Sequence, residues 1–422
     1  MNILQRLNPF RALAAASGRG ERRSSALLDG LRGAPNLTRV NVNEKSALTL
    51  TAAYAAINVI ATDVSCLPLK TYKRRKDGGR DEVTDHPASD LLKWSPNGES
   101  PAMRWRQANM GHALGWGNGY AEIERDGYGR PVGLHLIDPS TVEPKRRKSD
   151  RKLYYELADR TVLRPDQVLH LAMLGFDGLS GYSPVRMARQ AIGLGLAAET
   201  FGAALFGNGS MARGFLKTPQ KLSAEARQRL REQFESVHQG VYNAHRLAVL
   251  EQGLDWVQTS INPDDAQFLA TRQFQVIEIA RMYRIPPHKL GDFSQAGSAY
   301  NALEESNLDY LGTTLMPWCE AYEGECNLKL LTAQERADGY YIEHVLLALL
   351  RGNMAARGDF YMKLIGLGVF TPNMIAQLEN MNPTGPEGDR HYISVNLVPS
   401  NMAGMKQAPT SEVKSNAVVS AA

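Results

Sequence analysis

Residues 193–198, Gly-Leu-Gly-Leu-Ala-Ala, have the spacing of a dinucleotide-binding fingerprint with alanine in its last position. Such a motif binds a pyrophosphate only where it follows a strand and opens a helix. Here it lies inside a helical pattern that begins at Ser183-Pro184, an N-cap hydroxyl followed by proline at the first helical position. We therefore interpret these small residues as packing positions, and a dinucleotide-binding enzyme is a remote alternative.

Other catalytic motifs are incomplete or missing from the sequence. It contains no Gly-Lys pair, which excludes a Walker-type phosphate loop. Residues 178–182 lack the second glycine of a nucleophile elbow, and none of the nine histidines stands in a His-Glu-x-x-His arrangement. Cys319 and Cys326 share an apolar helix stripe, which predicts that both are core residues. We expect no catalytic residue, metal or cofactor, and a structural protein instead of an enzyme.

Basic residues gather in three places. Residues 1–40 hold seven arginines and two acids, so this segment carries a net charge of +5 and the rest of the chain −1. Two Lys-Arg-Arg-Lys runs, at 73–76 and 145–148, each stand at a predicted strand end beside a turn. We interpret both runs as solvated turn charge, able at most to make diffuse phosphate contacts. The nearly neutral body argues against a large positive surface that grips nucleic acid.

One long segment is acidic without opposing cations. Residues 290–328 contain no lysine or arginine. The seven acids of this segment are Asp292, Glu304, Glu305, Asp309, Glu320, Glu323 and Glu325. By composition alone, an exposed acidic helix face and a functional surface explain this bias equally well.

Length and composition set the scale of the fold that must position these residues. A chain of 422 residues with 43% hydrophobic content predicts two or three folded units with substantial cores. No apolar stretch is long enough to span a membrane, and polar residues near the N-terminus interrupt any secretory signal. Three cysteines without metal-ligand spacing predict a reducing compartment. We expect both ends, 1–40 and 401–422, to be flexible.

The first half of the chain mixes helical and strand patterns. Apolar periodicity and turn residues predict three helices, a hairpin and a region of short strands. In order, these are a helix at 48–66, a strand at 69–73 with a hairpin turn at 77–79, helices near 88–94 and 102–114, and strands and turns from 120 to 171.

Helices dominate the second half. They are expected at 183–207, 223–239, 263–284 and 301–331, with a small inserted unit around the second of them. Pro317 lies within the last helix, where proline removes a backbone donor and clashes with the preceding turn. We therefore predict a kink near residues 313–317.

These residues, taken in order, resemble the portal proteins of long-tailed phages from about Tyr54 to Pro383. Each marker is weak alone, but their order and spacing together are specific. The markers are Leu67-Pro68-Leu69, His86-Pro87 with Leu91-Leu92, Pro96-Asn97, Gly117-Asn118-Gly119-Tyr120, Leu136 to Pro139, Gly178-Leu179-Ser180 with Ser183-Pro184, Phe206 to Gly209, Asp265 with Phe268, Ile279-Ala280, and Ile285-Pro286-Pro287 with Leu290-Gly291.

The resemblance implies an α+β portal fold that assembles as a closed ring, usually of twelve subunits, at one capsid vertex. Small residues on a stem helix suit tight packing between neighbouring subunits of such a ring. The implied segments are a basic arm (1–40), an α/β wing (41–180), a stem helix (181–209), a small α+β clip (210–261), a second stem helix (262–290), a tunnel loop (291–300), a kinked helix returning to the wing (301–335), a wing and helical crown part (336–400) and a disordered tail (401–422).

The implied function is a channel through which terminase packages double-stranded DNA and through which the DNA is later ejected. Missing cations suit a channel in which DNA slides, because each phosphate contact adds to affinity. The residues implied for the channel are Asp292, Phe293, Ser294, Gln295, Ala296, Gly297, Ser298, Glu304, Glu305 and Asp309. Those implied for docking of the motor or adaptor are Arg227, Arg229, Arg231, Glu232 and Glu235.

The resemblance also implies partners and a location. The partners are further copies of the chain, the terminase large subunit, head-completion or adaptor proteins, the major capsid and scaffold proteins, and double-stranded DNA bound without sequence specificity, with no membrane. The location is the capsid vertex of the virion, after assembly in the bacterial host cytoplasm. Another ring-forming head connector or minor capsid protein is the alternative, which ring size and a missing through-channel would distinguish.

Overall fold

The computed structural model describes residues 37–207, 214–219, 223–238, 255–258, 265–294, 306–346, 354–379 and 381–393. The chain divides into two compact units, one up to Val345 and one from Leu346 onward. Within these residues no helix has the length and apolar character needed to cross a membrane. The class is α+β, because every strand pair in the described part of the chain is antiparallel.

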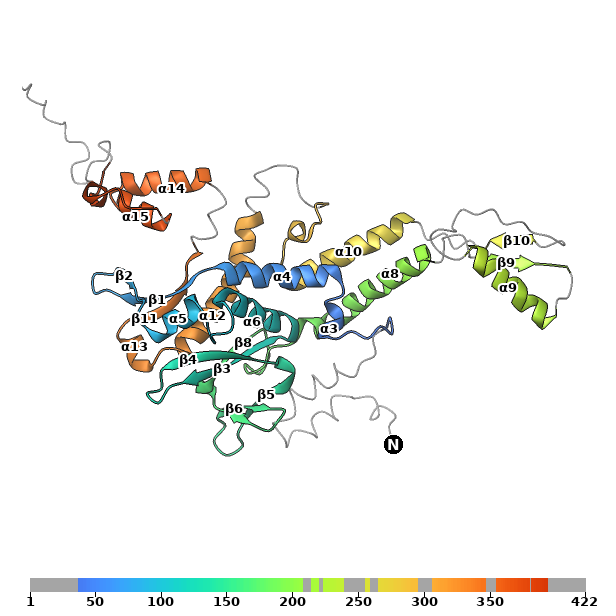
Figure 1. The fold of residues 1–422 in the computed structure, drawn as a ribbon, viewed down its shortest axis with the longest axis horizontal. Coiled ribbons are helices and arrows are strands. Elements are labelled where there is room, and N and C mark those ends of the chain that lie inside the picture. The colour runs from blue at the N-terminus through green and yellow to red at the C-terminus, as the bar shows by residue number, and fades with distance from the viewer. Residues whose placement is uncertain are drawn as a thin grey trace, which may run out of the picture. The chain divides into compact units, whose positions relative to one another are not determined.

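Four of the described helices lie early in the first unit (Figure 1). The Asn43 side chain caps the short α3 (Glu44–Ala47). The helix α4 (Thr51–Cys66) buries an alanine and isoleucine stripe and packs against α6 (Ala102–Trp116). It ends before Pro68, because the residue before proline is disfavoured in helical backbone. The short α5 (Pro87–Lys93) confirms the helix predicted near 88–94 and begins with proline at its first position.

The described residues of the first unit also form three three-stranded sheets, with strand orders β11-β1-β2, β4-β3-β8 and β5-β6-β7. The first four residues of β3, the central strand between β4 and β8, are all buried, so this strand lies in the core. The bounds are β1 (Leu69–Arg74), β2 (Arg80–Glu82), β3 (Asn118–Arg125), β4 (Pro131–Ile137), β5 (Val142–Arg146), β6 (Leu153–Leu157), β7 (Val162–Leu163), β8 (Val168–Ala172) and β11 (Tyr340–His344), with single turns η2 (Pro139–Thr141) and η3 (Pro165–Gln167).

Two long helices lie side by side after the sheets (Figure 1). The predicted helix at 183–207 is two helices, α7 (Pro184–Met187) and α8 (Arg189–Gly207), because the chain leaves helical geometry at Ala188. The second long helix is α10 (Asp265–Tyr283), and an ion pair of 3.2 Å between Arg272 and Glu199 joins it to α8.

The glycines at 193 and 195 lie inside α8, which confirms that their context is helical. A Cβ at Gly195 would lie 3.1 Å from the Leu50 side chain at the start of α4. The sequence predicted that these small residues are packing positions. Within the described residues, Gly195 packs against a leucine side chain.

The predicted inserted unit contains a helix between two strands. Its strands β9 (Gly214–Lys217) and β10 (Asp255–Gln258) pair antiparallel, with Asp255 opposite Lys217. The helix α9 (Ala224–His238) begins where Ser223 Oγ accepts the Ala226 amide at 3.2 Å. A further strand-like run predicted at 247–250 lies outside the described residues.

The last long helix changes register at the predicted place. Residues 306–310 are helical, residues Leu311–Leu315 form a π-helical turn (η6), and α12 (Met316–Lys329) follows. The Met316 amide donates to the Leu311 carbonyl, five residues back. Pro317 has no amide for the Thr313 carbonyl, and a π turn is a common cause of a kink. The sequence thus located the distortion, although not its π register.

Both units end in short elements. In the first unit, α13 (Ala333–Ala337) has a capping box in which Thr332 and Glu335 bond each other's amides. The second unit contains α14 (Met354–Gly366), α15 (Pro372–Leu378) and a single turn η8 (Pro386–Asp389). The Glu379 carboxylate accepts from both Arg357 and Tyr361, at 2.6 Å each, which ties the end of α15 to α14.

Candidate functional site

The predicted channel segment follows a sharp turn at the end of α10. Arg284 has a positive φ of 56°, and the Ile285 amide donates to the Ala280 carbonyl at 2.9 Å. The prolines at 286 and 287 then end the helix, as predicted, and η5 (Pro287–Leu290) leads to Gly291 with a φ of 84°. This turn brings the chain back along α10.

Asp292 is attached to that helix and does not extend freely from it. Its Oδ1 accepts the Ser294 amide at 2.9 Å and the Gln273 side chain at 3.2 Å. Hydrogen bonds from the Ser294 side chain and backbone are the main reason that the pKa of Asp292 lies below its ordinary value. The carboxylate is therefore a fixed negative charge at the start of the segment.

The other predicted channel residues divide into described and undescribed ones. Phe293 is 63% exposed, and Ser294 is exposed beside it. Asp309 is exposed one turn before the π turn. The remaining predicted residues, Gln295, Ala296, Gly297, Ser298, Glu304 and Glu305, lie outside the described residues.

Two acids of segment 290–328 form hydrogen bonds with edge strands of the sheets and do not face solvent. Glu323 accepts both the His344 amide (2.9 Å) and the His344 ring nitrogen Nδ1 (2.7 Å), at the end of β11. Glu325 accepts the His170 amide on β8 at 3.3 Å, and burial raises the pKa of Glu325. Glu320 on the same helix is exposed. The acidic bias of α12 is thus partly structural.

The predicted docking helix α9 presents charge to solvent. Arg227, Arg229 and Glu232 are exposed, and Glu232 accepts from the Gln228 side chain at 3.2 Å. Arg231 and Glu235 lie on the same helix, and their side chains are outside the described set. The strands β9 and β10, which precede and follow this helix in the chain, pair with each other.

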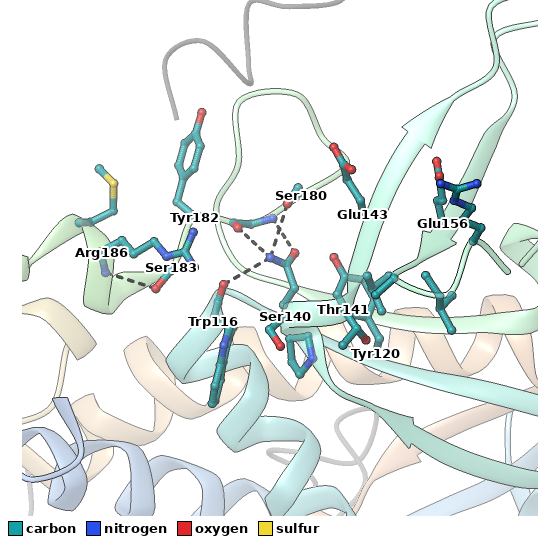
Figure 2. Close-up of a pocket in the computed structure, with 18 residues that line it drawn as sticks. Trp116, Tyr120, Ser140, Thr141, Glu143, Glu156, Ser180, Tyr182, Ser183 and Arg186 are labelled. Carbon is teal, nitrogen blue, oxygen red and sulfur yellow. Dashed lines mark hydrogen bonds between the residues drawn. The ribbon is translucent and has the colours of Figure 1, made fainter. Parts of the chain in front are cut away.

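A pocket of about 550 Å³ lies between β5–β6 and the start of α7. Figure 2 shows Glu143 and Glu156 on one side of it and Ser183 and Arg186 on the other. The Ser183 hydroxyl donates to the Gly115 carbonyl at 2.8 Å and also lies 3.3 Å from the Glu44 carboxylate. The labelled lining residues are Trp116, Tyr120, Ser140, Thr141, Glu143, Glu156, Ser180, Tyr182, Ser183 and Arg186. No histidine lines the pocket, and no group of three metal-ligand side chains gathers in the described ranges.

The pocket floor is held by a buried amide that the sequence analysis did not single out for this role. Asn118 Oδ1 accepts the Gly181 amide (2.7 Å) and faces His170 Nε2 (3.0 Å), while Asn118 Nδ2 donates to the Gly181 carbonyl (2.8 Å). Tyr155 Oη lies 3.2 Å from His170 Nδ1. This network joins the sheet to the loop before α7. The Gly-Asn-Gly-Tyr run was the one signal for it.

Comparison with known proteins gives consistent relatives. The sequence profile of the family described as phage portal protein matches residues 51–380. The portal protein of Enterobacteria phage HK97 is 29% identical over 377 residues, which are 87% of this chain and 87% of that protein. The probable portal protein of Streptomyces phage phiC31 is 32% identical over 371 residues, 84% of this chain and 80% of that protein.

Solved structures share the fold. The crystal structure of an HK97 family phage portal protein from Corynebacterium diphtheriae aligns with a TM-score of 0.56 at 15% identity, over 74% of this chain and 99% of that one. A chain in the neck of a native gene transfer agent particle, computed with C12 symmetry, aligns with a TM-score of 0.52 at 22% identity, over 89% of this chain and 99% of that one. With a family profile matched over most of its length, the chain belongs to the phage portal protein family.

Proposed function

We propose that this chain assembles into a closed ring of twelve copies and forms the channel through which double-stranded DNA enters and leaves a phage head. The family match over residues 51–380 carries the proposal. The particle neck with C12 symmetry, whose chain shares the fold, supports the copy number. A ring requires a heterologous interface that closes by rotation, and the long paired helices α8 and α10 offer an extended surface for it.

We assign the segments as the resemblance implied. The sheets and helices up to residue 180 form the wing, α8 and α10 the stem, the β9–α9–β10 unit the clip, residues 291–300 the tunnel loop, and the second unit most of the crown. The compact β9–α9–β10 unit between the two stem helices supports the assignment of the clip. The boundary of the second unit after Val345 supports a separate crown.

The channel lining would be the segment from Asp292 to Ser298 together with Glu304, Glu305 and Asp309. The fixed carboxylate of Asp292 and the exposed Asp309 support this assignment. Fixed acids repel phosphates, and a channel without cations does not retain the DNA that moves through it. Terminase, head-completion proteins, the capsid and its scaffold are the proposed partners, at a vertex of a particle assembled in the host cytoplasm.

Docking of the terminase large subunit or an adaptor is assigned to α9, through Arg227, Arg229, Arg231, Glu232 and Glu235. The exposed charges of this helix support the assignment. We expect Arg227→Glu with Arg229→Glu to abolish terminase capture by purified rings at moderate salt, because both charges reverse on one helix. Arg104→Glu, an exposed arginine on α6, is the control. Full terminase capture by intact double-variant rings would refute the assignment.

Native mass spectrometry with negative-stain imaging of the purified chain tests the ring directly. We expect an assembly of twelve copies with a central hole. A different closed ring would correct the copy number. A stable monomer at high protein concentration would contradict assembly by this chain alone and would assign ring closure to capsid or scaffold proteins.

A further inference from the structure

The two Lys-Arg-Arg-Lys runs are alike in sequence, but the fold treats them differently. The first run, residues 73–76, is engaged by neighbouring side chains. Lys73 and Arg74 lie over tyrosine rings of β11, 4.5 and 5.2 Å from the ring centres, and Arg75 forms an ion pair within its own hairpin. Three of its four cations therefore have a structural role.

The second run extends into the tip of the β5–β6 hairpin. Lys145 lies below the tip and bonds Glu143 and Glu156 at 2.9 and 2.8 Å, so its charge is balanced. The tip, residues 146–152, contains five cations and a single acid, Asp150. All seven tip residues are exposed. The tip thus carries a net formal charge of +4 in seven residues.

Two of the tip's cations have no acidic partner in the part of the chain that the structure describes. Asp150 reaches Arg147 and Lys152 only at 3.6 and 3.9 Å. Among the described residues, no acidic side chain forms an ion pair with Arg146 or Arg151. Like charges held this close repel one another, and a bound anion would relieve the repulsion between Arg146 and Arg151.

The tip is also held in a defined shape. The Arg147 amide donates to the Lys152 carbonyl and the Arg151 amide to the Arg147 carbonyl, both at 2.9 Å. Arg151 has a φ of 58°, in the left-handed region that favours glycine or asparagine. The sequence therefore places an arginine at a position where glycine would fit the backbone better.

The composition of the tip favours one kind of partner. None of its residues is apolar or aromatic. The cores of protein interfaces are enriched in aromatic side chains and depleted of lysine, whereas surfaces that bind duplex DNA are polar and strongly positive. We propose that the tip of the β5–β6 hairpin, Arg146 to Lys152, binds the phosphate backbone of double-stranded DNA outside the acidic channel. The inference rests on the proposed function for its ligand, since that function brings DNA to this protein.

Salt-dependent binding of a 30-base-pair duplex to the full-length chain tests the proposal. The variant Arg146→Gln/Lys148→Gln/Arg151→Gln is compared with the matched control Arg74→Gln/Arg75→Gln/Lys76→Gln, which removes the same charge from the first run. Each lost phosphate contact lowers the slope of log K against log salt by about 0.9. For each hairpin in contact with the duplex, we expect the magnitude of the slope of log K against log salt to fall by about 2.7 in the hairpin variant. The control should retain the wild-type slope.

Three results would overturn the proposal. The first is an unchanged slope in the hairpin variant. The second is an equal loss of slope in both variants, which would indicate an effect of net charge alone. The third is unchanged DNA binding by a hairpin variant that fails to enter capsids, which would assign the tip to a protein partner. Arg151→Gly provides a variant suited to the local backbone, because glycine adopts a positive φ without strain. It should raise the thermal midpoint and still lower the slope by about 0.9.

The proposed ring and the proposed hairpin contact are tested by separate measurements, so either can be refuted without the other. Native mass spectrometry reports on assembly, whereas the salt slope reports on the tip. A chain that remains monomeric but shows the expected loss of slope would contradict the ring and support the hairpin contact. A twelvefold ring whose slope is unaffected would do the opposite.

Discussion

His170 is a buried imidazole whose two nitrogens both have partners. Asn118 Oδ1 accepts the Gly181 amide and therefore faces His170 Nε2 as a second acceptor, which assigns the proton to Nε2. Nδ1 then accepts from the Tyr155 hydroxyl. Burial lowers the pKa of His170 to about 3, because the surroundings stabilise the neutral ring only. Through Asn118, this residue joins β8 to the loop that leads into α7.

The first unit should lose stability in mild acid through this histidine. The unfolded chain takes up the proton near pH 6.5 and the folded chain near 3, so the contribution of His170 is complete above pH 6.5 and declines as the pH falls toward 3. Between pH 7 and pH 5, we expect the free energy of unfolding to fall by about 2 kcal/mol more in the wild-type chain than in His170→Gln. Urea unfolding at several pH values measures the difference.

His135, whose side chain is 45% exposed, provides the control for this prediction. Because this ring is much less buried, His135→Gln should change the pH dependence of stability less than His170→Gln does. If His170→Gln retained the wild-type pH dependence, the buried histidine would not be responsible.

Residues with a local role were the ones that the sequence could predict. Ser183 caps its helix as expected, with its hydroxyl accepting the Arg186 amide at 3.2 Å, because N-capping depends on residues within one turn. Asn118 was quoted only as part of a family marker. Its partners Gly181 and His170 lie 63 and 52 residues away, and no local pattern indicates which distant groups an amide will bond.

At the scale of elements, α12 connects two sheets through their edge strands. Successive side chains of the helix bond backbone groups of β8 and β11, which would otherwise be left unpaired at a sheet edge. Asn327 imitates a neighbouring strand, because its side-chain amide accepts the Ile342 N–H at 2.7 Å and donates to the Ile342 carbonyl at 2.9 Å. These are the two hydrogen bonds that a residue of a further strand would make.

Removing that amide should weaken the attachment of α12. We expect Asn327→Ala to lower the free energy of unfolding by about 2 kcal/mol, because two buried backbone groups lose their partners. Glu320→Ala changes an exposed residue of the same helix and should cost less than about 0.5 kcal/mol. Guanidinium unfolding measures both. Equal effects of the two variants would mean that the Asn327 contacts contribute nothing specific.

Periodic helices were predicted with ends close to those observed, whereas pairing between distant strands was not. The predicted helix at 223–239 is observed at Ala224–His238, because capping and apolar spacing are local properties. The strand β11 pairs with β1, placing Leu69 opposite His344. The sequence predicted β1 but not β11, since pairing over such a separation depends on the whole fold. The break at Ala188 was also missed.

At the scale of the whole molecule, the structure divides the acidic segment into two roles. Beyond the π turn, Glu323 and Glu325 bond sheet edges inside one subunit. Before it, Asp292 and Asp309 remain as candidate channel charges. The family match supports the proposed ring. Composition predicted the charge bias correctly and could not assign each acid to one role.

Charge reversal before the π turn tests the channel assignment. We expect particles with Glu304→Lys and Glu305→Lys to package DNA several-fold more slowly, because a ring of twelve subunits repeats each new phosphate contact twelve times. Asp309→Lys should act in the same direction. Raising the salt concentration should restore part of the rate, since phosphate contacts weaken with salt. Packaging rate and final DNA content are the measurements.

Glu320→Lys is the matched control, because it introduces the same charge on the exposed face of α12 beyond the π turn. Rings of every variant are first shown to have the wild-type mass, so that slow packaging is not a failure of assembly. A wild-type rate in the Glu304 and Glu305 variant would refute the channel assignment. An equal loss with Glu320→Lys would attribute the effect to net charge, and the acidic segment would then be a solvated helix face.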